Sequence, residues 1–415
     1  MAIGLGMYCA ERVGGPFKDH YISFSSRPQL IKVDGVDFYD KVNRIYRTNL
    51  CDNTDLVRTF QLLKTATKMA NPEDRLDTIV VISDMEIDSM TTGRWSEEKT
   101  ATEMERVRKE WAPMPDSVAD MTVLSAEDID TIGSLVDFVF CAVDMKKDEI
   151  KSLEERYARA EIPVVSNNSA NRWTPDVPMV IPEINDAHLA VIEAQRKRLG
   201  TKRGFIAVKP NCSIQSYVPA LTPLLPYGIK RVVATTYQAI SGAGKTFREW
   251  PEMIDNVIPY IGGEEEKSEQ EPLRVWGRVE DGKIVKADAP LITTQCIRVP
   301  VSDGHTAAVF VDFEKKPSKE EILEAWKNFK GKPQTLGLPS APAQFITYFE
   351  EDNRPQAALD RDLYRGMGVS VGRLREDTLF DYKFVGLSHN TLRGAAGGAV
   401  LIAELLCREG YLTAK

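Results

Sequence analysis

The sequence contains little that points to a metal, a nucleic acid or a membrane. It has 4 His and 6 Cys in 415 residues, and because no two Cys form a CxxC pair, we expect no structural zinc and no other metal site. Its net charge of −8 argues against nucleic acid or an anionic membrane as a partner. No apolar run is long enough to span a bilayer, and the first residues do not follow the pattern of a secretion signal. Scattered, unpaired thiols are typical of reduced proteins, so we expect a cytoplasmic protein.

A glycine-rich dinucleotide fingerprint is also missing. Gly4-Leu5-Gly6 imitates part of it, but no strand precedes these residues, and Cys9 stands where the third glycine belongs. We therefore interpret this segment as part of an N-terminal helix.

What the sequence does contain is an alternation of apolar runs and helical patterns. Residues 79–84 read as a buried parallel strand and residues 97–111 as a solvated helix. The run Ala112-Pro113-Met114-Pro115 then marks a boundary. Beyond it, a strand over 136–143, a helix over 146–158 and a strand over 162–166 predict a parallel βαβ crossover.

A third apolar strand, residues 204–208, leads to Cys212. From Val232 onward strand-like runs dominate, such as 232–240 and 307–313, and they predict a mixed sheet flanked by helices. The tail over 394–406 is a small-residue, apolar helix that must be buried against another element.

Cys212 is the candidate nucleophile. It follows a strand and a Lys-Pro-Asn turn, and residues 213–224 are compatible with a helix, which would place the sulfur at the positive end of a helix dipole. His305 lies in a polar turn bounded by glycine and is the candidate general base. The alternative is a buried structural cysteine and a surface histidine, and from the chemistry of these residue types alone both interpretations stay open.

Five ordered motifs resemble aspartate-semialdehyde dehydrogenase, and together they are more specific than any one motif. The resemblance extends from about residue 112 to the end. The motifs are Pro210-Asn211-Cys212-Ser213, Tyr237 to Gly244, Ile261 to Lys267, Arg298 to His305, and Ser388 to Ala396.

The resemblance implies a role for each matching residue. Cys212 would be the nucleophile and His305 the acid/base, with Gln238 orienting the acyl group. Glu264 would hold the substrate's amino group and Arg298 its carboxylate. The remaining positions would contact substrate (Asn211), phosphate (Lys267 and Arg172) and the nicotinamide cofactor (Ser241, Gly242, Gly244 and Asn390).

The activity implied by this resemblance is the NADPH-dependent reductive dephosphorylation of aspartyl 4-phosphate to aspartate semialdehyde, through a thioester on Cys212. This step serves the biosynthesis of lysine, threonine and methionine. The implied small molecules are aspartyl phosphate, phosphate and NADP, and the implied assembly is a homodimer or homotetramer. We expect cofactor binding to be weakened or lost if the N-terminal segment does not replace the glycine-rich loop.

Residues 1 to about 111 resemble a different family, the von Willebrand factor A-type domain. The matching stretches are 20–26, 51–56 and 79–88. Thr54 and Asp84 fit two of the three metal-binding loops of such domains, whereas the first loop has no counterpart in the sequence. Because Mg²⁺ requires a nearly complete octahedron of oxygen ligands, we expect no strong binding.

The sequence therefore predicts an α/β protein with a Rossmann-like, doubly wound parallel sheet region and a glyceraldehyde-3-phosphate-dehydrogenase-like α+β catalytic domain. The expected divisions are a truncated von Willebrand A-like segment (1–111), the rest of the dinucleotide-type region (112–210), a catalytic and dimerisation domain (211–386) and a C-terminal helix that packs back on the N-terminal region (387–415).

Two alternatives remain at this point. One is a non-enzymatic binding module, or an inactive chimera, whose first part kept an A-domain role. The other is a dehydrogenase that acts on a different acyl phosphate, although Glu264, an acid suited to a substrate amine, argues against it.

Overall fold

The computed structural model describes residues 20–22, 30–32 and 124–414. Its contacts divide the chain into two units, Met1–Thr122 and Val123–Lys415. In the first unit, β1 (His20–Ile22) and β2 (Leu30–Lys32) form an antiparallel pair. The N-terminal helix, the strand over 79–84, the helix over 97–111 and the positions of Thr54 and Asp84 lie outside the described residues.

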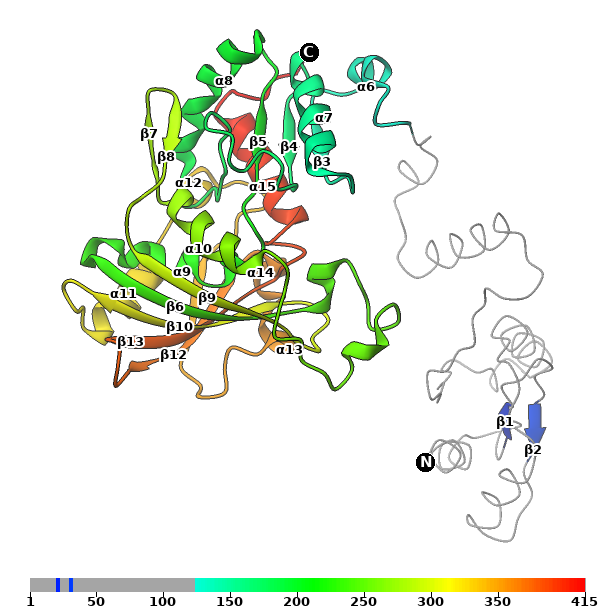
Figure 1. Cartoon of the computed structure of the whole chain (residues 1–415). Helices are drawn as coiled ribbons and strands as arrows, with labels where there is room; N and C mark the ends of the chain where they lie inside the picture. The colour runs from blue at the N-terminus through cyan, green and yellow to red at the C-terminus, as the bar shows by residue number, and fades with distance from the viewer. Residues whose placement is uncertain (1–19, 23–29, 33–123, 415) are drawn as a thin grey trace. The chain divides into compact units, whose positions relative to one another are not determined.

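The second unit contains a three-stranded parallel sheet in the order β3-β4-β5 (Figure 1). These strands are β3 (Val139–Cys141), β4 (Val164–Ser166) and β5 (Ile206–Val208). The helix α7 (Lys147–Arg159) joins β3 to β4, and both strand pairings are parallel. The predicted βαβ crossover is confirmed. Its strands are shorter than the apolar runs from which they were predicted.

Helices cover both faces of this parallel sheet. Val164 of β4 packs in one apolar cluster with Leu153 of α7. The next residue, Val165, points to the opposite face and packs with Leu405 of α15 (Ala396–Arg408), because successive side chains of a strand alternate between its faces. The burial predicted for the apolar tail is thus explained by its packing on the parallel sheet.

The second sheet has six strands in the order β11-β12-β13-β10-β6-β9. It is mixed, because β6 pairs parallel with β9, and β11 with β12, while the other pairs are antiparallel. The strands are β6 (Ile229–Gln238), β9 (Leu291–Arg298), β10 (His305–Phe313), β11 (Ile346–Phe349), β12 (Val369–Glu376) and β13 (Tyr382–Ser388).

Helices pack on one face of the six-stranded sheet (Figure 1). There, α9 (Val218–Leu221) and α11 (Lys319–Asn328) meet through Trp326, which is fully buried and donates from Nε1 to the carbonyl of Ala220 at 2.7 Å. Further elements of this unit are α6 (Ile129–Leu135), α8 (Ile192–Leu199), α10 (Glu264–Val275), β7 (Arg278–Glu280), β8 (Lys283–Val285), α12 (Lys332–Leu336), α13 (Ala357–Asp360) and α14 (Leu363–Gly366).

The sheet register brings three candidate residues to one end of the sheet. Gln238, the last residue of β6, lies opposite Arg298, the last residue of β9. β10 runs antiparallel to β6, so its first residue, His305, lies at the same end. Strand ends of this kind are the positions at which a rigid sheet can present polar groups to a ligand.

Candidate active site

Cys212 lies just after β5 and begins a short 3₁₀ helix over Ser213–Ser216. The single helix predicted over 213–224 is wrong. After the first 3₁₀ turn the chain forms α9 and then a second 3₁₀ helix over Thr222–Tyr227. Pro219, Pro223 and Pro226 cannot supply the N–H groups of a continuous α-helix, which explains the interruption. The field of a helix dipole at Cys212 is correspondingly small.

Cys212 and His305 are nevertheless neighbours. The distance from Cys212 Sγ to His305 Nε2 is 3.5 Å. On the other side of the ring, the backbone N–H of Ala239 donates to Nδ1 at 3.0 Å. Since Nδ1 accepts a hydrogen bond, the proton of the neutral imidazole is on Nε2, and it points towards the sulfur.

The electrostatics of this pair differ from the expected low thiol pKa. Burial and the Glu264 carboxylate raise the pKa of Cys212 above its usual value, against the opposing effect of Lys209 and Arg172. Burial, reinforced by the Arg298 guanidinium, lowers the pKa of His305 to about 3. In the free protein the pair is therefore a neutral imidazole beside a largely protonated thiol, so the sequence-based expectation of an ionised thiol is corrected.

Glu264, at the start of α10, binds two of the other predicted substrate-binding residues, Asn211 and Lys267, and the predicted catalytic residue Gln238. Its carboxylate accepts hydrogen bonds from Asn211 Nδ2 at 3.0 and 3.1 Å and from Gln238 Nε2 at 3.3 Å, and forms an ion pair with Lys267 Nζ at 2.7 Å. Burial acts to raise the pKa of Glu264, but Lys267 and these hydrogen bonds outweigh it, so the pKa is lowered. The side chain is thus a buried carboxylate that stays charged.

Arg298 approaches the same centre from β9. It is buried and donates from Nη1 to the carbonyl of Ala239 at 2.6 Å. A Cβ at Gly242 would lie 2.8 Å from Arg298 Nη1 and 3.0 Å from His305 Nε2. A side chain at this position would therefore push Arg298 or His305 from its place, and glycine leaves both undisturbed.

Arg172 is held about two turns further along the same face of α10. It forms a buried ion pair with Glu271 (Nη1 to Oε1, 2.9 Å) and donates from Nε to the carbonyl of Lys209 at 2.9 Å. The second oxygen of Glu271 accepts the backbone N–H of Asn211 at 2.6 Å. Arg172 and Lys267 are therefore each neutralised by a separate carboxylate, and these carboxylates are seven residues apart on α10.

Three of the residues that match cofactor positions, Ser241, Gly242 and Gly244, lie in one turn, and the fourth, Asn390, is hydrogen-bonded to that turn. Asn390 donates from Nδ2 to Ser241 Oγ and accepts the backbone N–H of Gly304, both at 2.8 Å. Gly244 closes this turn with a φ of +68° and open space around it. Ser241 to Gly244 are thereby fixed beside the segment that leads into His305.

One buried polar atom at the end of β4 has no partner of its own in the described part of the chain and could receive a polar ligand. Asn167 Oδ1, directly after β4, is buried and has no hydrogen-bond partner among the described residues. It lies at the carboxyl end of the parallel sheet, which is where ligands bind in open α/β sheets. This position suits one polar end of a dinucleotide, although the sequence offers no glycine-rich turn for the pyrophosphate.

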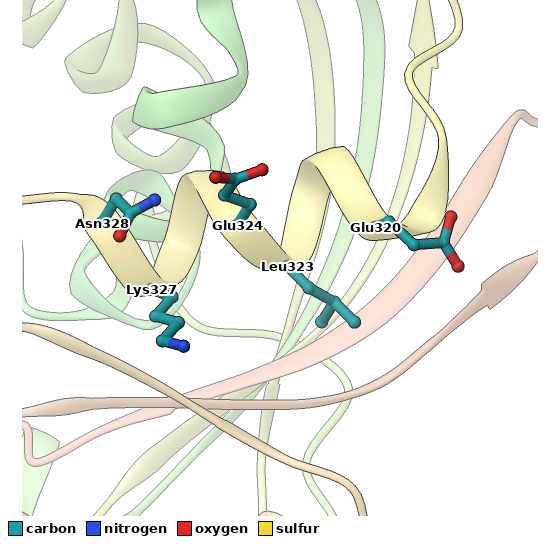
Figure 2. A pocket seen from close by; sticks show the side chains of 5 residues that line it. All are labelled: Glu320, Leu323, Glu324, Lys327 and Asn328. Atoms are coloured by element: carbon teal, nitrogen blue, oxygen red, sulfur yellow. The ribbon is translucent and has the colours of Figure 1, made fainter.

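The described residues contain one further surface depression, on α11. A surface depression of about 420 Å³ is lined by Glu320, Leu323, Glu324, Lys327 and Asn328, all from α11 (Figure 2). It contains no nucleophile or histidine. Among the residues with described positions, no cluster of His, Cys, Asp and Glu could hold a metal ion, and no helix could cross a membrane.

The structure adds residues that sequence reasoning missed. Lys209 is a buried lysine directly after a buried strand, and Glu271 anchors the backbone before Cys212. A charged residue that interrupts the apolar run 204–208 and precedes Pro210 was a readable signal for Lys209. Glu271 had no such signal, because it is one of several acids on a polar helix.

Comparisons with known proteins agree with the two-sheet arrangement. The model "Semialdehyde dehydrogenase, NAD binding domain" matches residues 83–192, and "Semialdehyde dehydrogenase, dimerisation domain" matches residues 221–393. Residues 1–115 match "Domain of unknown function (DUF7788)". The expected von Willebrand A-type resemblance of the first segment is therefore not confirmed.

Individual relatives are similar over most of their length. The aspartate-semialdehyde dehydrogenase of Methanothermobacter thermautotrophicus is 45% identical over 296 residues, which are 71% of this chain and 83% of the relative. That of Saccharomyces cerevisiae is 41% identical over 307 residues, with the same two shares. The solved structure of the Candida albicans enzyme with NADP is 36% identical, with a TM-score of 0.64, over 72% of this chain and 84% of that one. With these identities and shares, the chain belongs to the aspartate-semialdehyde dehydrogenase family.

Proposed function

We propose that this chain catalyses the NADPH-dependent reductive dephosphorylation of aspartyl 4-phosphate to aspartate semialdehyde, through a thioester on Cys212. The observation that carries the proposal is the 3.5 Å contact of Cys212 Sγ with His305 Nε2, in a chain 45% identical to an aspartate-semialdehyde dehydrogenase. In a cell this step would serve the biosynthesis of lysine, threonine and methionine.

The first half-reaction needs only groups of this chain. The Cys212 sulfur, once ionised, attacks the acyl carbon of the substrate, and the carbon–oxygen bond to phosphate breaks. The electron pair of that bond leaves with phosphate, and a thioester remains on Cys212. The Nε2–H of His305 lies within hydrogen-bond distance of the sulfur, so it stabilises the thiolate before attack.

In the second half-reaction, bound NADPH supplies the hydride that reduces the acyl group. The Nε2–H of His305 donates a hydrogen bond to the oxygen of the thiohemiacetal as that oxygen gains charge, and the proton stays on the imidazole. That oxygen then re-forms the carbonyl and the carbon–sulfur bond breaks. The electron pair of that bond leaves with the Cys212 sulfur as a thiolate, and the aldehyde is released. Asn390 fixes the Gly304 backbone and thereby the start of β10, which keeps the imidazole beside the reacting carbon.

Substrate recognition divides between two charged groups. We infer that Glu264 binds the substrate's ammonium and that Arg298 binds its carboxylate, because both are buried, charged and adjacent to Gln238. Lys267 and Arg172 would receive the phosphate, and this requires each to loosen its pairing with Glu264 or Glu271. Such an exchange of ion-pair partners is favourable only when the dianionic phosphate is present.

Cofactor binding would involve Ser241, Gly242, Gly244 and Asn390 at the nicotinamide end. Their connected hydrogen bonds and the unpaired Asn167 Oδ1 support this assignment. NADP is proposed over NAD because the structurally similar Candida albicans enzyme was solved with NADP.

We further propose a homodimer or homotetramer in the cytoplasm. The matched dimerisation model covers 221–393, and within that range Ile254, Val257, Tyr260 and Leu291 are all exposed, the last at 73%. Exposed apolar residues in such numbers are typical of a surface that meets another subunit. The divisions at residues 111, 210 and 386 and the A-domain-like character of residues 1–111 stay predictions.

The decisive experiment runs the reaction backwards with the full chain. Aspartate semialdehyde, phosphate and millimolar NADP should give NADPH, followed by its absorbance, and Cys212→Ala should abolish the signal. An exposed lysine change, Lys230→Met at the far end of β6, serves as the control. Binding without any turnover, at saturating cofactor, would instead favour the non-enzymatic module, and turnover of other semialdehydes alone would favour a different acyl-phosphate substrate.

A further inference from the structure

A lysine that the proposed mechanism does not use is enclosed in the fold three residues before Cys212. Lys209 follows β5 and is only 3% exposed. Its side chain lies against the first turn of α15, where a Cβ on Gly398 would come within 2.5 Å of Lys209 Cε. The glycine therefore leaves the space that this side chain occupies.

Lys209 has no counter-ion of its own. Its ammonium donates to the carbonyl of Pro210 at 3.2 Å, and no carboxylate in the described part of the chain lies within ion-pair distance of it. The two acids nearby are committed to other partners, Glu271 to Arg172 and Glu183 to Arg393. A buried charge with one carbonyl as partner is costly to the fold, so its effect on the neighbouring groups is large.

The charges that face Lys209 come from four elements. Burial lowers the pKa of Lys209 to about 7; Cys212 and Glu271 act to raise it, while Arg172 and Arg393 act to lower it. Near neutral pH both forms of the amine are therefore populated. Ionisation of the Cys212 thiol and protonation of Lys209 therefore favour one another.

The cations that face Cys212 are Lys209, Arg172 and the buried Arg298. Glu264 on α10 raises the pKa of the thiol, whereas Lys209 and Arg172 lower it, with Lys209 the larger of the two. Arg172 has its charge neutralised by Glu271. His305 is neutral and contributes only its Nε2–H.

We propose that Lys209 is a positioning residue for the nucleophile, whose buried ammonium stabilises the Cys212 thiolate while the neutral imidazole of His305 donates a hydrogen bond to the same sulfur. The inference rests on the proposed function only in taking Cys212 as the nucleophile. It assigns the ionisation of the thiol to a lysine on the strand end rather than to a histidine that accepts its proton.

The test follows the pH dependence of thiol alkylation by iodoacetamide in the full chain. Lys209→Met removes the charge at similar volume. It should move the midpoint of the alkylation rate of Cys212 against pH upward by about one pH unit or more. Lys209→Arg retains a cation and should restore much of the wild-type midpoint. Lys230→Met, a surface change on β6, should leave it unmoved, and Cys212→Ala gives the background from the other thiols.

If Lys209 merely supported the fold, Lys209→Met would lower the thermal stability and leave the alkylation midpoint of Cys212 unchanged. Under the proposal, replacing an unpaired buried charge with methionine should leave thermal stability unchanged or raise it, because the desolvation cost disappears. The proposal is overturned if folded Lys209→Met keeps the wild-type midpoint, or if Lys209→Arg shifts it as far as Lys209→Met does. Should the methionine variant fail to fold, Lys209→Gln carries the same comparison.

These outcomes separate the inference from the function on which it rests. The readout uses neither NADPH nor aspartyl phosphate. Equal labelling of wild type and Cys212→Ala would remove Cys212 as the nucleophile and with it the proposed function. Labelling at Cys212 with no effect of Lys209 would remove only the role of the lysine.

Discussion

The two sheets of the Val123–Lys415 unit differ in how fully they provide their part of the reaction. The six-stranded sheet brings Gln238, Arg298 and His305 to one end, beside Cys212. The parallel sheet has three strands among the described residues, with β3 at one edge, where Phe140 is 48% exposed. Within the described part of the chain, the groups proposed for the covalent chemistry are therefore more fully represented than a site for the whole cofactor.

The largest effect expected is on the covalent half. Cys212→Ala should lower turnover by about 10⁴-fold or more, because no other thiol in the described part of the chain lies within hydrogen-bond distance of His305. Cys407→Ala, an exposed thiol on α15, is the matched control and should leave turnover unchanged. The steady-state turnover rates of both variants test this prediction. A rate for Cys212→Ala within tenfold of the wild type would show that the thioester is not on the pathway.

The next effect concerns the cofactor half. Among the described residues, no glycine-rich strand–turn–helix presents backbone N–H groups to a pyrophosphate. Each such charge-assisted hydrogen bond contributes about 1.5–3 kcal/mol, and losing two of them weakens affinity by at least about 10²-fold. Titration of NADPH beside the Candida albicans relative measures the difference. Equal affinities would mean that the N-terminal segment supplies a pyrophosphate site of its own.

A smaller effect is expected from His305 on stability against pH. Its folded pKa is about 3, below the ordinary value of about 6.5, so between these values the unfolded chain binds more protons. Stability should therefore fall as the pH is lowered through this window, by up to about 1.4 kcal/mol per pH unit. Urea unfolding at pH 7, 6 and 5 should show the slope. His305→Asn should reduce it, and an identical slope in the variant would contradict the buried, neutral imidazole.

Much of this architecture follows from local sequence patterns. The apolar runs at 204–208 and 307–313 predicted β5 and β10, because a strand buried on one or both faces leaves a strong apolar signature. The helix after Cys212 failed for a local reason too, since three prolines outweighed a helix-compatible composition. The motif spacing indicated Cys212 and His305 as candidates for one site.

What sequence patterns could not predict is the electrostatic state of the site. The ring tautomer of His305 depends on the backbone of Ala239, 66 residues away, and the pairing of Arg172 depends on Glu271, 99 residues away. Burial, which raises the thiol pKa and lowers that of Lys209, is a property of the packed fold. A short-range pattern contains none of these distances.

The smallest effect expected tests the edge of the parallel sheet. Phe140 on β3 is half exposed and touches Phe138 edge-to-face, with ring centroids 5.1 Å apart. Phe140→Ser should cost at most about 1 kcal/mol, the scale of one aromatic contact. Leu405→Ala, in α15 on the same face of this sheet and fully buried, should cost about 2–5 kcal/mol.

Denaturant unfolding of the two variants in the full chain makes the comparison direct, because both residues belong to the same sheet region and differ in burial. A small cost at Phe140 would show that β3 presents an open edge in solution, as the described residues have it. A cost at Phe140 equal to that at Leu405 would show that this edge is covered in the working protein. In that case the cofactor half would be more complete than its three described strands, and the expected loss of NADPH affinity should shrink in the same preparation.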